Sequence, residues 1–347
     1  MAEFTIAAGN ARALIDLAVA KGASRKTLTE RSEIDPAKLQ DQDNRVPFAK
    51  YVALMQAGKE LCHDPALALH FGEAFDFEDI SIVGLIGIAS ETMAEAFAQL
   101  SRYARLAVEV DCAGTDRFIL KRIAGQLWIV DTRRNANDFP ELTESTFARM
   151  VCSFRRAFGE PHFLKAVHVT HPAPAYRAEY DRVLRLPVVF DSDKNALLAD
   201  DALLDWRNPN ASRYVFGILS AHAEELLKRL ERSKSTRGQV ESLLMPILHT
   251  GDANMMTIAS KLGLSRQTLF RKLKMEGVTF EKVLDELRHT MALHYLRSRR
   301  VSVNETAYLV GFSEPAAFSR AFKRWTGYSP RTIKSALRAE RAGNQEL

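Results

Sequence analysis

The last hundred residues contain a repeated segment, and this repeat limits the possible folds more than any other feature of the chain. The two copies occupy residues 257–274 and 303–323. Each contains an alanine, then a glycine, an apolar residue and a serine, followed by a run with apolar residues four positions apart. The matching positions are Ala259 and Ala307, Gly263 and Gly311, Leu264 and Phe312, and Ser265 and Ser313.

This order of residue types is typical of a helix-turn-helix motif, in which two helices cross at about 90–120° through a short turn. Glycine adopts the left-handed backbone that ends the first helix, and alanine lets the helices approach closely. The apolar residue fills the corner, and the serine can cap the second helix. The repeat therefore predicts two such motifs in one all-α domain.

The second helix of each motif has a predictable outer face. Leu269 and Leu273 in the first copy, and Phe318 and Phe322 in the second, recur at i, i+4 and should face inward. The remaining positions face the surface that a major groove of DNA would contact. The candidate DNA-binding residues are Arg266, Gln267, Thr268, Phe270, Arg271, Lys272, Lys274, Pro315, Ala316, Ala317, Ser319, Arg320, Lys323 and Arg324.

Residue chemistry suggests different roles within this set. Arg271 and Arg320 hold equivalent outward positions, and arginine suits bidentate contact with guanine or with phosphate. Gln267 can pair with an adenine edge, whereas lysines are suited to phosphate contacts that position without specifying sequence. The second helix begins with Pro315 and two alanines, which carry no side-chain donors. We therefore expect more base recognition from the first motif and more backbone anchoring from the second.

The segment between the two copies predicts a connecting helix. Residues 280–298 carry apolar side chains on one side, and a helix of that length is about 28 Å long. It would separate the two recognition helices by about one turn of DNA, which is about 34 Å. One chain could then enter two successive major grooves on one face of a duplex.

Charge is distributed unevenly and agrees with a polyanionic partner. Residues 233–347 hold 19 lysines and arginines against 10 acidic residues, a net charge of +9. The first 232 residues hold 29 against 33, a net charge of −4. Such an asymmetry is typical of a sensing or scaffolding part joined to a part that meets nucleic acid.

The repeat region resembles the DNA-binding domain of the AraC/XylS family. Residues 240–338 carry its features, above all the string AYLVGFSEPAAFSRAFKRWTGYSP at residues 307–330. The first copy departs slightly, with Phe280 in the segment GVTF. Residues 39–73, with Gly84 and the helix after Thr92, resemble the arabinose-binding-type sensor domain found ahead of such domains. The resemblance implies a transcription regulator, and the sensor domain's name does not identify the ligand.

Patterns in residues 1–205 predict a mixed α and β domain. Helical periods lie at residues 11–21, 47–61, 65–73, 93–108 and 141–158. Residues 116–122 and 126–131 flank Ala124-Gly125 as a hairpin, and residues 165–170 and 187–190 are short strand candidates. A long helix follows, with Val215, Leu219, His222, Leu226 and Leu230 on one face.

The fold class expected is therefore multidomain: an N-terminal α+β domain followed by an all-α domain with two helix-turn-helix motifs joined by a linker helix. The expected boundaries are a sensing or dimerisation domain at residues 1–205, a helix and linker at 206–238, the DNA-binding domain at 239–338 and a tail at 339–347. The polar stretch 231–238 marks the division.

Several other functions find no support in the chain. DNA-repair methyltransferases with such domains need an activated cysteine, and often a four-cysteine zinc cluster, whereas Cys62, Cys112 and Cys152 are isolated. His162, His168 and His171 could form a metal site, but His168 and His171 would face opposite sides of a strand, which disfavours it. Neither a phosphate loop nor an apolar run long enough to span a membrane occurs. We expect no catalytic residue, metal, cofactor or membrane segment.

Two functions remain open for residues 1–205: a sensor for a small-molecule effector, or a domain that only dimerises or contacts partner proteins. Phe71, Phe75, Phe77 and Phe139 could line a pocket of such a sensor, but core packing explains them equally well. We prefer the sensor. The whole chain is interpreted as a cytoplasmic transcription regulator, an activator, that binds double-stranded operator DNA as a homodimer and contacts RNA polymerase.

Overall fold

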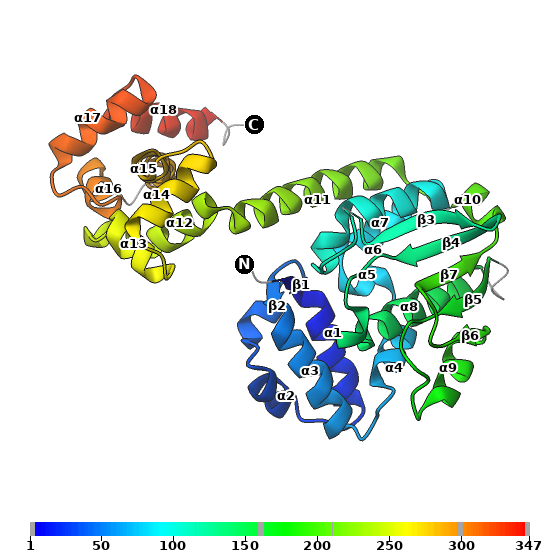
Figure 1. The fold of residues 1–347 in the computed structure, drawn as a ribbon. Coiled ribbons are helices and arrows are strands. Elements are labelled where there is room, and N and C mark those ends of the chain that lie inside the picture. Colours follow the sequence, from blue (N-terminus) through cyan, green and yellow to red (C-terminus); the bar gives the residue numbers. More distant parts are fainter. Residues whose placement is uncertain (1–3, 115, 159–162, 210, 298–300, 344–347) are drawn as a thin grey trace. The chain divides into compact units, whose positions relative to one another are not determined.

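The computed structural model describes residues 4–114, 116–158, 163–209, 211–297 and 301–343; side chains are described as far as residue 336. The chain divides into two compact units, Met1–Lys228 and Arg229–Leu347, which are described separately below. The first contains helices and strands, and the described part of the second contains helices only (Figure 1). The expected order, a mixed domain followed by a helical one, is confirmed.

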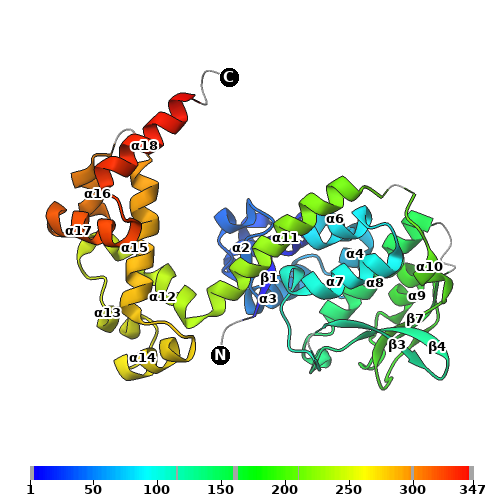
Figure 2. The same cartoon turned by 90° about the horizontal axis from the view of Figure 1, so that it is seen from above.

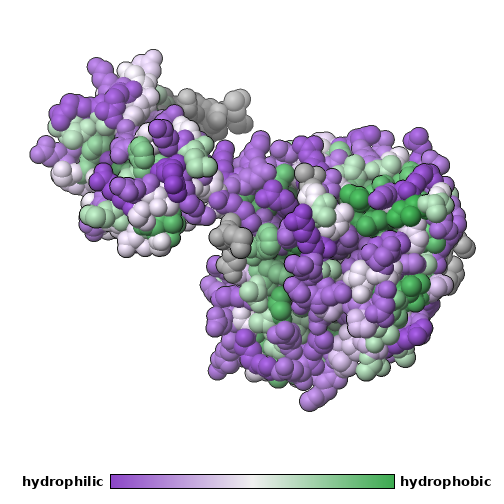
Figure 3. All heavy atoms as spheres, viewed as in Figure 1, coloured by the Kyte–Doolittle hydropathy of each residue, from purple (hydrophilic) through white to green (hydrophobic). Residues whose placement is uncertain are grey.

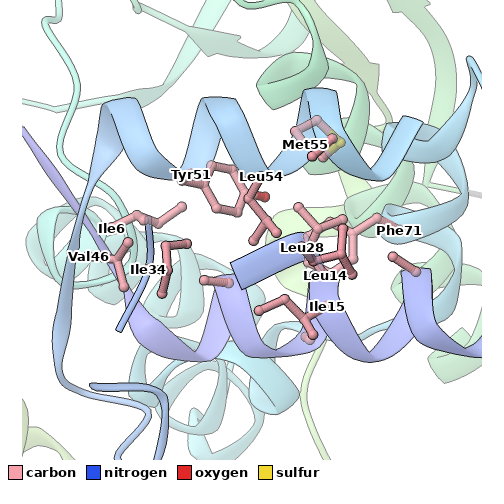
Figure 4. Packing of buried hydrophobic residues seen from close by; sticks show 14 of the residues in the cluster. Ile6, Leu14, Ile15, Leu28, Ile34, Val46, Tyr51, Leu54, Met55 and Phe71 are labelled. Carbon is pink, nitrogen blue, oxygen red and sulfur yellow. The ribbon is translucent and has the colours of Figure 1, made fainter. Parts of the chain in front are cut away.

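The first unit begins with a helical subdomain. Strand β1 (Thr5–Ala7) pairs antiparallel with β2 (Arg45–Pro47) beside helices α1 (Ala8–Ala20), α2 (Arg25–Ser32) and α3 (Phe48–Leu61), and the short 3₁₀ helix η1 (Pro36–Leu39). Leu14, Leu28 and Tyr51 from these three helices meet in one buried cluster (Figure 4). Burial of this apolar surface stabilises the subdomain.

A second group of helices follows and covers a sheet. It contains α4 (Leu67–Ala74), α5 (Phe77–Ile80), α6 (Ile82–Ala89), α7 (Met93–Ala107) and α8 (Glu141–Phe158). Helices α7 and α8 lie on one face of the sheet (Figure 2). Strand β3 lies at the edge of the sheet, and its residues 119–122 are exposed, so both of its faces are open to solvent there.

The sheet has five strands in the order β3-β4-β7-β5-β6. Strands β3 (Phe118–Ile123) and β4 (Gln126–Asp131) form the expected antiparallel hairpin, and Ala124 and Gly125 make its turn with φ of 51° and 78°. Strand β5 (Leu164–His168) pairs antiparallel with β7 (Asn195–Ala199) and parallel with β6 (Val188–Val189). Short helices α9 (Arg177–Leu184) and α10 (Ala202–Asp205) complete the unit.

The sequence patterns did not predict the central strand, β7. Its segment, Asn-Ala-Leu-Leu-Ala, is buried at four of five positions because β4 and β5 pair on either side of it. A strand buried on both faces shows no alternation, so the period that marks a half-exposed strand does not appear.

Helix α11 (Arg213–Lys234) continues past residue 230, where the expected apolar face ended. The boundary between the two units, at Lys228 and Arg229, falls inside this helix. The next helix, α12, begins at Thr236, so the polar stretch 231–238 is mostly helical. The apolar face expected on α11 is wrong in part, because Val215 is 44% exposed and His222 is exposed. Ala223, one position on from His222, is fully buried instead.

The second unit continues with α12 (Thr236–Leu244), the 3₁₀ helix η3 (Met245–Thr250), α13 (Met255–Lys261), α14 (Arg266–Met275), α15 (Phe280–Leu296), α16 (Val303–Leu309), α17 (Pro315–Thr326) and α18 (Pro330–Gly343). Within this unit α15 runs between two helix pairs, α13–α14 and α16–α17 (Figure 2). Side chains from all these helices share one apolar core. Helix α18 passes the expected boundary at residue 338, and residues 344–347 of the expected tail lie outside the described residues.

Candidate nucleic-acid interface and ligand pocket

The helix pair α13–α14 is set by local capping and a glycine turn. Asn254 accepts a hydrogen bond from the Thr257 amide at 3.0 Å and so caps α13, and Ser265 caps α14 through the Thr268 amide at 3.1 Å. Between the helices, Gly263 has φ of 65° and the Leu264 amide donates to the Ala259 carbonyl at 2.9 Å. The sequence therefore fixes both ends of the turn.

The pair α16–α17 repeats this turn. Gly311 has φ of 83°, and the Phe312 amide donates to the Ala307 carbonyl at 2.9 Å, the bond made by the matching residues of the first pair. A Cβ on Gly311 would lie 2.1 Å from the Leu248 carbonyl oxygen, so both backbone angle and space require glycine. A capping box of Ser302 and Glu305 begins α16.

The expected capping role of Ser313 is wrong. Glu314 occupies the N-cap position of α17 in extended backbone, without a capping side-chain hydrogen bond, and Pro315 is the first helical residue. Proline suits this position because its fixed φ is helical and its missing N–H would have no partner there. The second copy therefore begins its helix differently from the first.

The inward and outward faces follow the expected period. Leu269 and Leu273, like Phe318 and Phe322, are buried. The exposed candidates are Arg266, Gln267, Phe270, Arg271, Lys272, Lys274, Ala316, Arg320, Lys323 and Arg324, and the half-buried ones are Thr268, Pro315, Ala317 and Ser319. On the visible face of this unit, hydrophilic surface surrounds small apolar areas (Figure 3).

Three of the basic candidates differ in how they are held. Arg324 donates to Asp285 of α15 at 2.9 Å, and the Trp325 indole donates to the same carboxylate at 3.3 Å. Among the described residues, neither Arg271 nor Arg320 forms an ion pair. Both side chains are exposed.

Helix α15 holds the second turn through Arg288, a residue that no sequence pattern singled out. The Arg288 guanidinium donates to the carbonyls of Val310 and Gly311 at 3.1 and 3.3 Å. It also lies 4.8 Å from the centre of the Phe312 ring. Burial lowers the pKa of Arg288, and nearby Asp285 opposes this shift. Its partners lie 22 and 23 residues away, so no local pattern reveals the contact.

The first unit contains a pocket of about 630 Å³, and of the four phenylalanines considered for such a pocket only Phe77 lines it. Its lining comes from α5, α6, α7 and α8, and from the segment 206–209 that precedes α11. Apolar side chains form most of it: Phe77, Val83, Ile88, Met93, Phe97, Leu100, Met150, Phe154 and Trp206. No sequence period marks such a pocket, because the same residue types also build cores.

Charged groups lie along one part of the pocket lining. Arg156 donates through Nε to Asp76 at 3.1 Å, through Nη2 to the same carboxylate, and through Nη1 to the Glu73 carbonyl at 2.8 Å. Glu78 is half-buried, and burial, with the charges of Asp76 and Asp79, raises its pKa. Clusters of three or more potential metal-ligating side chains do not occur among the described residues.

The second unit has two helix pairs, each with an exposed and basic second helix, and the first unit contains a pocket of ligand size. These features define a DNA-binding transcription regulator. Family models agree: one described as "Helix-turn-helix domain" matches residues 258–336. Another, "Arabinose-binding domain of AraC transcription regulator, N-term", matches residues 22–208, more than half of the chain. The chain belongs to the AraC family of transcription regulators, as its sequence motifs predicted.

Curated relatives and solved structures carry the same class of name. The "Ornithine utilization regulator" of Pseudomonas aeruginosa is 26% identical over 330 residues, covering 94% of this chain and 95% of the relative. The "HTH-type transcriptional activator RhaS" of Escherichia coli is 40% identical over 84 residues, 24% of this chain and 30% of the relative. The transcriptional regulator CdpR of Pseudomonas aeruginosa aligns over 89% of this chain and 96% of its own, with 22% identity and a TM-score of 0.42. All three names describe regulators or activators.

Proposed function

We propose that this protein is a sequence-specific transcription activator that binds operator DNA as a homodimer and responds to a small molecule through its N-terminal unit. In each subunit, α13–α14 and α16–α17 act as two helix-turn-helix motifs joined by α15. Helices α14 and α17 enter successive major grooves. The observation that carries this proposal is the matched pair of turns, each followed by a helix with an unpaired, exposed arginine among the described residues.

Residue chemistry assigns the contacts within each helix. Gln267 and Arg271 recognise base edges in the first groove, and Phe270, 53% exposed, contacts a thymine methyl group. Arg320 contacts guanine or phosphate in the second. The remaining candidates, Arg266, Thr268, Lys272, Lys274, Pro315, Ala316, Ala317, Ser319, Lys323 and Arg324, contact the sugar-phosphate backbone or line the groove.

Helix α15 suits the connecting role. Its 17 residues span about 25 Å. It packs against α12, which contacts α13 and α14, and against α16. A rigid connector of this length fixes the spacing of the two recognition helices, so that both grooves are entered without further ordering of the chain.

The test uses an operator located by genome-wide footprinting of the bound protein. Arg271→Ala and Arg320→Ala should each weaken operator binding by roughly 1–3 kcal/mol in a gel-shift assay. Arg134→Ala is the matched control, because this exposed arginine lies in the first unit with its nearest ion-pair partner, Asp111, at 3.9 Å. Unchanged operator affinity for both variants, with intact circular dichroism, would refute the assignment.

The N-terminal unit is proposed as the sensor because its family model describes a ligand-binding domain and because its pocket touches the segment leading into α11. The alternative is a unit that only dimerises or contacts partners such as RNA polymerase. A sensor changes operator affinity when its ligand is added, whereas a pure dimerisation unit does not.

A regulator of chromosomal DNA acts in the cytoplasm, where we place it. In the part of the chain that the structure describes, no helix could cross a membrane.

A further inference from the structure

The pocket of the first unit has the size of a site for one small molecule. Its volume of about 630 Å³ lies within the range of roughly 300–1,000 Å³ that small-molecule sites occupy. Helices α6 and α7 contribute to it on one side, α8 on another, and Trp206 to Pro209 form a further part of the lining.

Each hydroxyl and side-chain amide of the lining already has at least one partner within the chain. Ser90 donates to the Ile86 carbonyl at 2.9 Å, and Thr92 accepts from the Glu95 amide at 3.1 Å. The side-chain amide of Asn208 donates to the carbonyls of Ile88 and Ser90 at 2.7 and 3.2 Å. A sugar needs many hydrogen-bonding partners when it leaves water, and a site with few available ones disfavours it. The occupant must therefore be mostly apolar.

The charges of the lining favour one positive group on that occupant. Arg156 donates to Asp76 through Nε and Nη2 and to the Glu73 carbonyl through Nη1, so the charge of Asp76 balances this cation and Glu78 leaves the lining with a net charge of −1. Among the described residues no other side chain donates a hydrogen bond to the Glu78 carboxylate; its own backbone N–H does, and the charge of Arg156 acts on it. A half-buried carboxylate of this kind gains most from a charged donor.

We propose that this pocket binds a small, mostly apolar molecule that carries one amino group, with the amino group paired to Glu78. This deepens the proposed sensor function and rests on it only for the response at DNA. The first turn of α11 lies next to the site. The backbone amide of Asn208 donates to the Glu91 carbonyl at 2.8 Å. Arg213 forms one ion pair with Glu91 and another with Glu95, the latter at 2.8 Å. An occupant that shifts segment 206–209 therefore acts on the helix that leads out of the unit.

The binding test compares three probes that share one carbon skeleton: 4-phenylbutylamine, 4-phenylbutanol and 4-phenylbutanoate, with L-arabinose as a fourth. Each is added to the full chain and the melting temperature is measured, because a ligand of the native state raises it in proportion to the logarithm of its concentration. The amine should bind at least about tenfold more tightly than the alcohol, the factor that one charge-assisted hydrogen bond contributes. A larger shift from the carboxylate or from arabinose would overturn the proposal, as would no shift from any probe.

Two variants locate the site. A Cβ on Gly87 of α6 would meet no atom within 4 Å, so Gly87→Leu should fill pocket space without a backbone clash and abolish the amine's effect. Gly217→Leu is its control, because Gly217 is also helical with open space at its Cβ but lies outside the pocket lining. Glu78→Gln should reduce the amine's affinity to that of the alcohol. Retained amine binding in Gly87→Leu, or an unchanged amine preference in Glu78→Gln, would contradict the proposal.

Operator binding measured on the same samples separates this inference from the proposed function. If the amine fails to bind while the chain still binds its operator, the ligand class is wrong and the regulator stands. If the amine binds through Glu78 but the chain binds no operator, the site stands and the proposed DNA-binding function fails.

Discussion

Replacing Arg288 with alanine should loosen the second helix pair without touching any residue assigned to DNA. The change removes two hydrogen bonds, to the carbonyls of Val310 and Gly311, and the contact with the Phe312 ring. Each hydrogen bond contributes about 1 kcal/mol and the ring contact about 0.5–1 kcal/mol. The variant no longer buries a guanidinium, and water can reach the two carbonyls, so part of this loss is offset. The local free energy of opening of α16 and α17 should therefore fall by about 2 kcal/mol.

Native-state hydrogen exchange of the full chain, followed by mass spectrometry of peptides, measures this local free energy. A loss of about 2 kcal/mol corresponds to roughly thirtyfold faster exchange in α16 and α17. Peptides from α13 and α14 serve as the internal control and should change little. Arg288→Lys should recover part of the protection, since one ammonium can still reach a carbonyl. Equal protection of α16 and α17 in the alanine variant and the parent would refute the reasoning.

Three further predictions concern the same unit. Lys323→Ala should lower the slope of log affinity against log salt concentration by about one, measured by fluorescence anisotropy on operator and non-operator DNA alike. Phe318→Ala empties a fully buried position and should destabilise the unit by roughly 3–5 kcal/mol in denaturant unfolding, whereas Phe270→Ala, at an exposed position, should cost little. The Glu276 carboxylate accepts from the backbone amides of Thr236 and Arg237 at 2.6 and 3.0 Å and caps α12. Burial alone would raise its pKa, but these donors lower it, so the stabilisation is present at neutral pH and lost as the pH falls below about 4. Glu276→Gln should cost about 1 kcal/mol at pH 7 and flatten that acid-side loss, measured by thermal unfolding across pH.

The sequence predicts well those structural features that depend on residues close together in the chain. The period of Leu269 and Leu273 identified a buried face, the pair Ala124-Gly125 located a hairpin, and Ser265 marked a helix start; all three are confirmed. Strand β7 was missed because both of its faces are buried. The pocket was missed for a related reason, since its phenylalanines and methionines have the composition of a core and only packing leaves them around a space.

The two helix pairs also differ in what fixes their orientation. Helix α14 begins at a serine cap within its own segment, and the sequence predicted that start correctly. Helix α17 begins at Pro315 without a side-chain cap, and α15 supports it instead: Arg288 binds the preceding turn and Asp285 binds Arg324 near its end. The first pair is therefore set by local sequence and the second by tertiary contacts. Because the second pair depends on α15, substitutions on that helix should, under the proposed mode of DNA binding, weaken the contacts of α17 more than those of α14.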